Sequence, residues 1–138
     1  IILRPFFIYS SKQPERMLLP RLLHRLLRQE AISLAGDDGI KLNPIHSRDA
    51  AAATIAALQL TKSNIINVAG TDIVSLREIV EEMGQLLDKT PIFVKQDEKA
   101  RHIIGAIDKM CQLLVTPKIS LSAGLGELVE RWGGLKSD

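Results

Sequence analysis

The sequence is poor in the features that most often reveal a protein's partner. Its one cysteine, Cys111, cannot form an intrachain disulfide, so a reducing compartment such as the cytoplasm is expected. No apolar run approaches the roughly 20 residues that a membrane span needs. The net charge of +2 is too small to indicate binding to nucleic acid or to an anionic membrane. Composition therefore predicts no nucleic acid and no membrane as a partner.

The sequence also lacks the usual catalytic and metal-binding motifs. Its histidines, His24, His46 and His102, are scattered without the spacing of metal ligands, and there is no serine nucleophile elbow. The nearest match to a dinucleotide-binding glycine motif is Gly124-Leu125-Gly126, which has no third glycine and no strand leading into it. We therefore predict no catalytic, cofactor-binding or metal-binding residue, and we expect Gly124 to allow close packing inside a helix.

The patterns that are present predict an α/β protein. The length suits one compact domain, and hydrophobic residues at 46% with charged residues at 25% are ordinary for a globular protein. Apolar spacing and turn residues divide the chain into short strands and amphipathic helices. Strands are expected at 1–9, 31–35, 64–69 and 91–94, and helices at 19–29, 48–60, 75–87, part of 103–114, and 121–132.

The opening residues Ile1-Ile2-Leu3 are already part of a strand-like apolar run. A continuous run of this kind is typical of a strand buried on both faces of a parallel sheet. Such a strand needs neighbours, and few candidates follow it. The pattern therefore predicts that the chain is the C-terminal part of a longer protein; the alternative is an edge strand in a small self-contained domain.

Two helices are well specified by local signals. Ser75 and Glu78 have the spacing of a capping box, and Val74 can pack on Ile79 as a hydrophobic staple. In the helix at 19–29, leucines recur at helical spacing and predict a buried stripe. The arginines of that helix could bind phosphate or nucleic acid, but without interleaved aromatic residues we expect a solvated face.

The stretch 36–54 places polar residues where a strand becomes a helix. A turn rich in Gly and Asp precedes Asn43-Pro44, which favours extended backbone. Ser47 is then expected to cap an Ala-rich helix, with Asp49 near the positive helix end. Asn43 and His46 lie at this junction, a place where ligand contacts are often found.

Four blocks in order resemble one family. Residues 3–9 resemble an "RPxxxYG" strand, and residues 36–51 resemble the segment from Gly-Asp to the Asp-Ala-Ala helix start. Residues 67–79 and 120–125 match two later blocks. Together they are similar to the substrate domain of the extended short-chain dehydrogenases/reductases, the NAD-dependent epimerase/dehydratase family.

The resemblance implies the C-terminal part of a Rossmann-like extended short-chain dehydrogenase, with a few strands and about four to five helices. Residues 1–138 would form a single substrate-binding domain that lacks the N-terminal dinucleotide-binding half. The complete protein would use NAD or NADP, whereas this chain alone would bind neither. The family's Tyr-x-x-x-Lys pair is absent, because Tyr9 is followed by Lys12 one position too early. The residues leave open whether the chain itself takes part in catalysis.

The resemblance also suggests pocket residues. Members that act on nucleotide sugars tend to carry Asn and Arg where this chain has Phe7 and Leu42, so a less charged, more apolar small-molecule substrate is implied. The alternative is that both side chains simply pack in the core. The substrate-binding candidates are Phe7, Tyr9, Leu42, Asn43 and His46. The alternative function is a non-catalytic, self-associating binding or assembly module, and in either case a homo-oligomer is expected.

Overall fold

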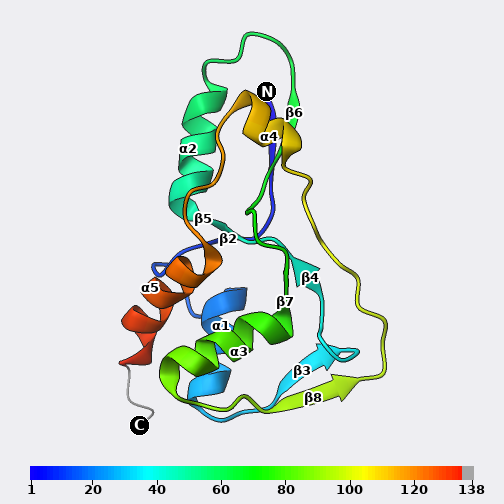
Figure 1. Cartoon of the computed structure of the whole chain (residues 1–138), viewed down its shortest axis with the longest axis vertical. Coiled ribbons are helices and arrows are strands. Elements are labelled where there is room, and N and C mark those ends of the chain that lie inside the picture. The colour runs from blue at the N-terminus through cyan, green and yellow to red at the C-terminus, as the bar shows by residue number, and fades with distance from the viewer. Residues whose placement is uncertain (135–138) are drawn as a thin grey trace.

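The computed structural model describes residues 1–134 as an elongated mixed α/β molecule, as predicted (Figure 1). The strands are β1 (Ile2–Pro5), β2 (Ile8–Tyr9), β3 (Ile32–Ala35), β4 (Lys41–Leu42), β5 (Ile45–His46), β6 (Ile65–Val68), β7 (Val74–Ser75) and β8 (Phe93–Gln96). The helices are α1 (Leu18–Leu27), α2 (Ser47–Ala57), α3 (Leu76–Leu87), α4 (Asp108–Leu113) and α5 (Leu121–Gly133). No helix within residues 1–134 has the length and hydropathy of a membrane span.

Within the described residues, the strands form two-stranded pairs in place of one continuous sheet. β1 pairs with β6, β2 with β5 and β3 with β8, all parallel, whereas β4 pairs antiparallel with β7. The β1–β6 pair lies at the upper end in Figure 1, and the β3–β8 pair lies at the lower end. The shorter pairs connect the two ends, so the β2–β5 and β4–β7 ladders form the middle of the molecule.

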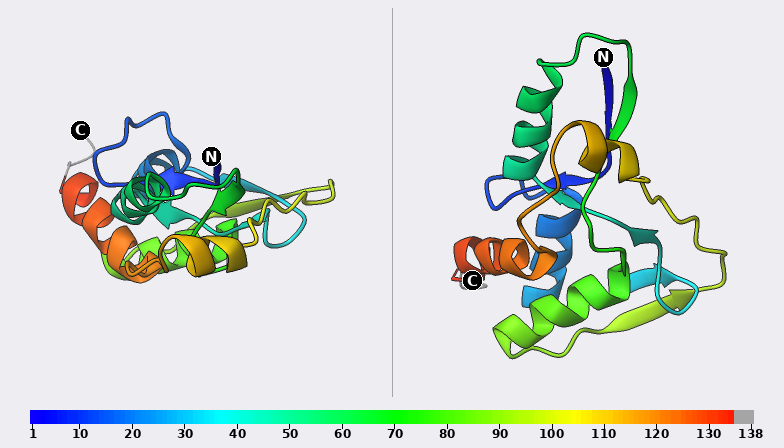
Figure 2. Two further views of the ribbon diagram at one scale, coloured as in Figure 1. Left: turned by 90° about the horizontal axis from the view of Figure 1, so that it is seen from above. Right: turned by 45° about the horizontal axis from the view of Figure 1, so that its top comes forward.

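The lower end contains the larger hydrophobic core, which we call the lower core. It is built by α1, α3 and α5 with β3, and Figure 2 shows these helices lying against one another. The leucine stripe predicted for α1 is confirmed. Its buried members are Leu19, Leu22, Leu23 and Leu26. On α5, Leu121, Leu125 and Leu128 are buried.

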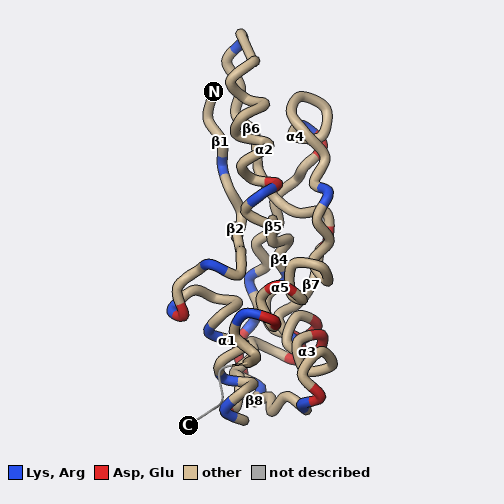
Figure 3. Tube along the Cα trace, turned by 90° about the vertical axis from the view of Figure 1, so that its left-hand side faces the viewer, with Lys and Arg blue, Asp and Glu red and all other residues tan. Residues whose placement is uncertain are grey.

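The upper end has a smaller core and an uncovered surface. Here α2, α4 and β6 bury Ala53, Ile66 and Met110. By contrast Ile2 is 58% exposed and Ile65 is 50% exposed. β1 is therefore not buried on both faces within this chain, and among residues 1–134 it pairs with β6 on one edge, so its other edge is open. In Figure 3, β1 and β6 carry little charge, whereas charged residues gather around α1 and α3.

The first strand is not continuous, which corrects the expectation of one strand over 1–9. Phe7 has a positive φ of 46°, a left-handed conformation that is unusual for a bulky side chain. The chain bends there, so β1 ends at Pro5 and β2 begins at Ile8. The bend moves the chain from β6 to a new partner, β5.

The cap of α2 also differs from the expectation. Ser47 is the first helical residue, and the N-cap is His46, whose Nδ1 accepts a hydrogen bond from the Arg48 N–H at 3.2 Å. Asp49 instead accepts hydrogen bonds from a distant segment. Its Oδ2 accepts from the Lys118 N–H at 3.0 Å and from the Ile119 N–H at 2.8 Å. Asp49 thus ties the start of α2 to the approach to α5.

The capping box of α3 is confirmed. The Ser75 hydroxyl accepts a hydrogen bond from the Glu78 N–H at 3.1 Å, and the Ser75 N–H donates to Glu78 Oε2 at 2.6 Å. The hydrogen bond from the Ser75 N–H, with a smaller contribution from the Ser75 side chain, lowers the pKa of the Glu78 carboxyl below its ordinary value, because the charged carboxylate is the better acceptor.

Candidate functional site

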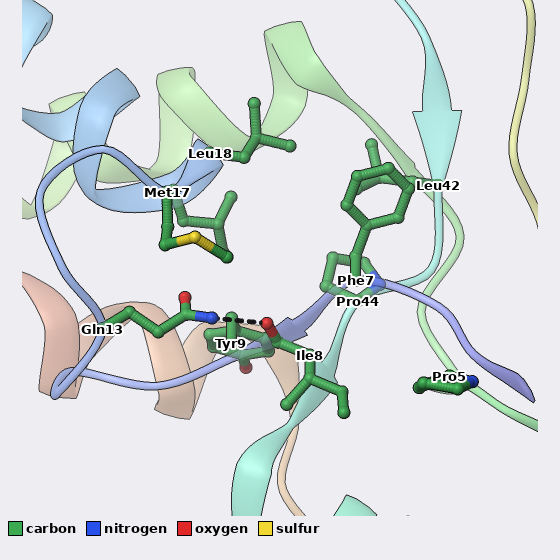
Figure 4. A pocket seen from close by; sticks show the side chains of 10 residues that line it. Pro5, Phe7, Ile8, Tyr9, Gln13, Met17, Leu18, Leu42 and Pro44 are labelled. Atoms are coloured by element: carbon green, nitrogen blue, oxygen red, sulfur yellow. Dashed lines mark hydrogen bonds between the residues drawn. The ribbon is translucent and has the colours of Figure 1, made fainter. Parts of the chain in front are cut away.

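A pocket of about 290 Å³ lies in the middle of the molecule, where the bend after β1 meets the start of α1 and β4 (Figure 4). None of the side chains that line it is charged. The lining residues are Pro5, Phe7, Ile8, Tyr9, Gln13, Met17, Leu18, Leu19, Leu42 and Pro44. Three of the residues predicted to bind substrate, Phe7, Tyr9 and Leu42, are therefore brought together on one pocket.

Phe7 and Leu42 form one side of this pocket, and Figure 4 shows the Phe7 ring beside Leu42. Leu42 is 0% exposed and belongs to the lower core, against which Phe7 also packs. The Phe7 carbonyl accepts a hydrogen bond from the Ile45 N–H at 3.2 Å, which helps to fix the bend. The two side chains pack in the core and also line the pocket, and an apolar substrate stays a prediction.

Tyr9 is a wall of the pocket and a poor proton donor or acceptor. Its side chain is 2% exposed, and its hydroxyl has no hydrogen-bond partner among residues 1–134. Burial, with smaller contributions from carboxylates such as Asp72 and Glu127, raises the pKa of the Tyr9 phenol above its ordinary value. The phenol therefore stays protonated at neutral pH. The Tyr9 hydroxyl packs against Gly124 of α5, where an added Cβ would lie only 1.9 Å from it.

His46 lies behind Tyr9 and outside the pocket lining. The two rings are edge-on, with centroids 5.4 Å apart. Because Nδ1 of His46 accepts from the Arg48 N–H, Nε2 carries the proton and donates to Glu127 Oε2 at 3.0 Å. Glu127 is also paired with the Arg48 guanidinium. His46 thus connects the start of α2 to α5 and packs against the Tyr9 ring.

Asn43 is fully engaged in holding the backbone. Its amide nitrogen donates to the carbonyls of Gly70 at 3.1 Å and Gly105 at 2.9 Å, and its amide oxygen accepts from the Gly105 N–H at 2.9 Å. The residue is 2% exposed and does not line the pocket. Residue 70 must be glycine where its backbone packs against Pro44, since an added Cβ would lie 1.9 Å from the Pro44 carbonyl oxygen.

Seven of the ten lining residues were not predicted as substrate-binding candidates, among them Gln13 and Met17. Gln13 and Met17 come from the polar link before α1, which has no apolar period to mark them. The Gln13 amide nitrogen donates to the Ile8 carbonyl at 2.7 Å, so the link folds back over β2 (Figure 4). The one available signal was position, since loops that follow strand ends often contact ligands.

No metal site is formed by the described part of the chain: within residues 1–134, no three His, Cys, Asp or Glu side chains gather closely enough to hold an ion. In the same residues, no strand runs through a glycine-rich turn into a helix in the manner of a pyrophosphate cradle. The pocket offers a shape and an apolar lining, and what it can do chemically is bind and orient a ligand.

The arrangement of these elements is similar to that of NAD-dependent epimerases and dehydratases of the extended short-chain dehydrogenase/reductase fold, and the resemblance seen in the sequence blocks is confirmed in the fold. No family model matches the chain, and no curated protein matches it.

Three solved structures illustrate the likeness. UDP-glucuronic acid 4-epimerase from Bacillus cereus, in complex with UDP-glucuronic acid and NAD, is 25% identical with a TM-score of 0.84, over 98% of this chain and 45% of that one. dTDP-glucose 4,6-dehydratase from Bacillus anthracis, in complex with NAD, is 23% identical with a TM-score of 0.79, over 97% and 44%. UDP-glucose 4-epimerase from Thermotoga maritima, with UDP-glucose, is 20% identical with a TM-score of 0.78, over 95% and 45%. The chain thus spans less than half of the length of these enzymes.

Proposed function

We propose that this chain is the substrate-binding part of an NAD(P)-dependent epimerase/dehydratase-like oxidoreductase, with residues 1–138 as a single substrate-binding domain. The observation that carries the proposal is the fold match, which covers 98% of this chain but 45% of an epimerase that holds both NAD and UDP-glucuronic acid. A domain of this kind supplies the surface that binds and orients the substrate, while the cofactor chemistry depends on residues elsewhere.

The pocket supports this proposal through its position and its lining. Phe7, Tyr9 and Leu42 would contact the substrate, and Asn43 and His46 would hold the backbone and the Tyr9 ring in place behind them. Tyr9 would be a wall and not an acid or base, since its phenol is buried with a raised pKa. NAD or NADP would be bound by the complete protein.

A calorimetric titration of the 138-residue chain with NAD⁺, NADH, NADP⁺ and NADPH tests whether this chain alone binds the cofactor. We expect no saturable binding, because the sequence contains no glycine turn that could receive the pyrophosphate. Tight binding of any of the four would contradict the proposal.

The coding DNA upstream of Ile1 gives the second test. An in-frame segment, or a neighbouring gene, that encodes a strand-turn-helix glycine motif and a Tyr-x-x-x-Lys pair is the expected result. A start codon immediately before Ile1, with no such partner gene, would remove the hydride chemistry from the proposal.

A second candidate function, a self-associating binding or assembly module, is favoured by the uncovered surface of β1 and β6. Ile1, Ile2 and Ile65 are 49%, 58% and 50% exposed on a parallel strand pair with an open edge. Burying such a surface against a second copy would be favourable.

Light scattering should show self-association that Ile65→Glu weakens and that Ile73→Glu, at an exposed site outside this surface, does not. A monomer at all concentrations would count against the module and against the expected homo-oligomer.

A further inference from the structure

The lining of the central pocket is hydrocarbon on nearly every side. Phe7, Leu42 and Met17 contribute apolar side chains, and the polar groups among the lining residues are the Gln13 amide and Tyr9. The Tyr9 hydroxyl lies against Gly124 of α5. A phosphate placed in this pocket would lose its water without meeting a charged donor, which is strongly unfavourable.

Two cationic side chains next to lining residues, Arg4 and Lys41, are directed away from the pocket. Arg4 precedes the lining residue Pro5, and its Nε donates to Asn67 Oδ1 at 3.0 Å on the neighbouring strand. Lys41 precedes Leu42 on β4, and successive side chains of a strand point to opposite faces. Lys41 is accordingly exposed while Leu42 is buried. Arg4 and Lys41 therefore face away from the pocket, whereas Lys12 and Arg16, which precede the lining residues Gln13 and Met17, are exposed to solvent.

The backbone strain at Phe7 supports a ligand-binding use of the pocket. A left-handed conformation at a phenylalanine is rare, and such strain is found most often where a site requires a particular geometry. At Phe7 the conformation sets a half-buried aromatic ring beside Leu42 at the pocket wall (Figure 4). An aromatic wall of this kind packs well against a planar or ring-bearing group.

The rim offers limited hydrogen bonding. The Gln13 amide nitrogen is engaged by the Ile8 carbonyl at 2.7 Å, and Figure 4 shows the amide oxygen turned toward Met17. That oxygen can accept one hydrogen bond from a ligand. Met17, 40% exposed and flexible, can adjust its side chain over what enters.

We propose that the central pocket binds an uncharged, mainly apolar, ring-bearing group of the substrate and discriminates against a nucleoside diphosphate, with Phe7 and Leu42 as the residues that determine this specificity. The proposal rests on the proposed function only in treating the occupant as part of a substrate. Gln13 contributes a single hydrogen bond at the rim, suited to one hydroxyl or amine of the bound group.

The uncharged fluorophore N-phenyl-1-naphthylamine is the probe for this pocket. We expect saturable binding to the 138-residue chain with a rise in fluorescence. Met17→Glu and Ile8→Glu place a carboxylate on the rim at residues 40% and 38% exposed, so the fold is preserved. Each should weaken binding by about tenfold or more, because the charge must be desolvated when the probe enters. Ile73→Glu, 56% exposed and away from the pocket, is the matched control and should leave binding unchanged.

Three outcomes would overturn the proposal. They are no saturable probe binding, binding that the two rim variants do not weaken, and displacement of the probe by UDP-glucose at comparable or lower concentration. These results are distinct from a failure of the proposed function. If the pocket binds the probe but the coding DNA holds no cofactor motif, the oxidoreductase proposal fails and the pocket proposal stands. If the upstream DNA encodes a cofactor motif but the pocket prefers UDP-glucose, the oxidoreductase proposal stands and the proposal of an apolar ligand fails.

Discussion

The two ends of the molecule are built from similar residues but differ in how completely they are covered. At the lower end, α1, α3 and α5 close around leucines that are at most 6% exposed, such as Leu22 and Leu125. At the upper end Ile66 is buried, but Ile2 of β1 and Ile65 of β6 stay 58% and 50% exposed. A helix can cover its apolar stripe with two neighbouring helices, but a parallel strand pair has two faces and two edges to cover. The lower core is therefore self-sufficient, and the upper surface is suited to a partner.

The largest expected effect comes from emptying the lower core. Leu125→Ala removes a fully buried side chain and should lower the free energy of unfolding by about 3 kcal/mol, from lost transfer energy and the cavity left behind. Ile65→Ala in the half-exposed upper surface should cost less than about 1 kcal/mol. Urea unfolding followed by circular dichroism measures both. Equal losses would mean that the upper surface is already covered in solution.

The contact between α5 and the pocket can be tested with two glycines of one helix. Gly124→Ala would place a Cβ 1.9 Å from the Tyr9 hydroxyl and should cost about 2 kcal/mol through overpacking. Gly126→Ala meets nothing within 4 Å and should stabilise by up to about 1 kcal/mol, because alanine favours the helix. Thermal melts of the two variants should shift in opposite directions. A stable Gly124→Ala protein would show that Tyr9 is not held against α5.

A smaller effect is expected at the start of α3, within the lower core. Ser75→Ala removes the hydroxyl that accepts the Glu78 N–H and should cost about 1 kcal/mol. Ser120→Ala at α5 is the comparison, since Ser120 caps Ala123 without a reciprocal side chain and is exposed. Its loss should be smaller, and a larger loss at Ser120 than at Ser75 in urea unfolding would contradict the value given to the capping box.

The smallest effect is the pH dependence of that same cap. The pKa of Glu78 is lowered in the folded protein from an ordinary value of 4.5, so its stabilisation is present above that pH and is lost as the pH falls through the folded pKa. Glu78→Gln should therefore destabilise at pH 7, while the difference from the wild type narrows as the pH drops below 4.5. Urea unfolding at pH 7 and pH 3 measures this, and a constant difference would exclude the carboxylate as its cause.

The elements that the sequence predicted well are those whose signals are local. α3 follows from the Ser75–Glu78 spacing and α1 from its leucine period, because both depend on residues one turn apart. The break at Phe7 was missed, since it arises from the change of strand partner from β6 to β5. The His46 cap was missed because its ring is fixed by Glu127, far along the chain.

The candidate site was predicted in part. Phe7, Tyr9 and Leu42 came from the resemblance and meet at one pocket, whereas Asn43 and His46 lie behind it in hydrogen-bond networks. Gln13 was missed because a side chain that reaches back to its own strand leaves no periodic trace. Substrate contact by any of these residues stays a prediction.

The long span between paired strands has a consequence for synthesis on the ribosome. β1 is made well before its partner β6, which is complete only when residues 65–68 emerge, and β3 must wait for residues 93–96. The lower core closes last, because α5 at 121–133 completes it. Until then the apolar strands are open edges, which are prone to pair with other chains. A nascent chain of this design benefits from early covering of β1, whether by a chaperone or by a preceding folded segment.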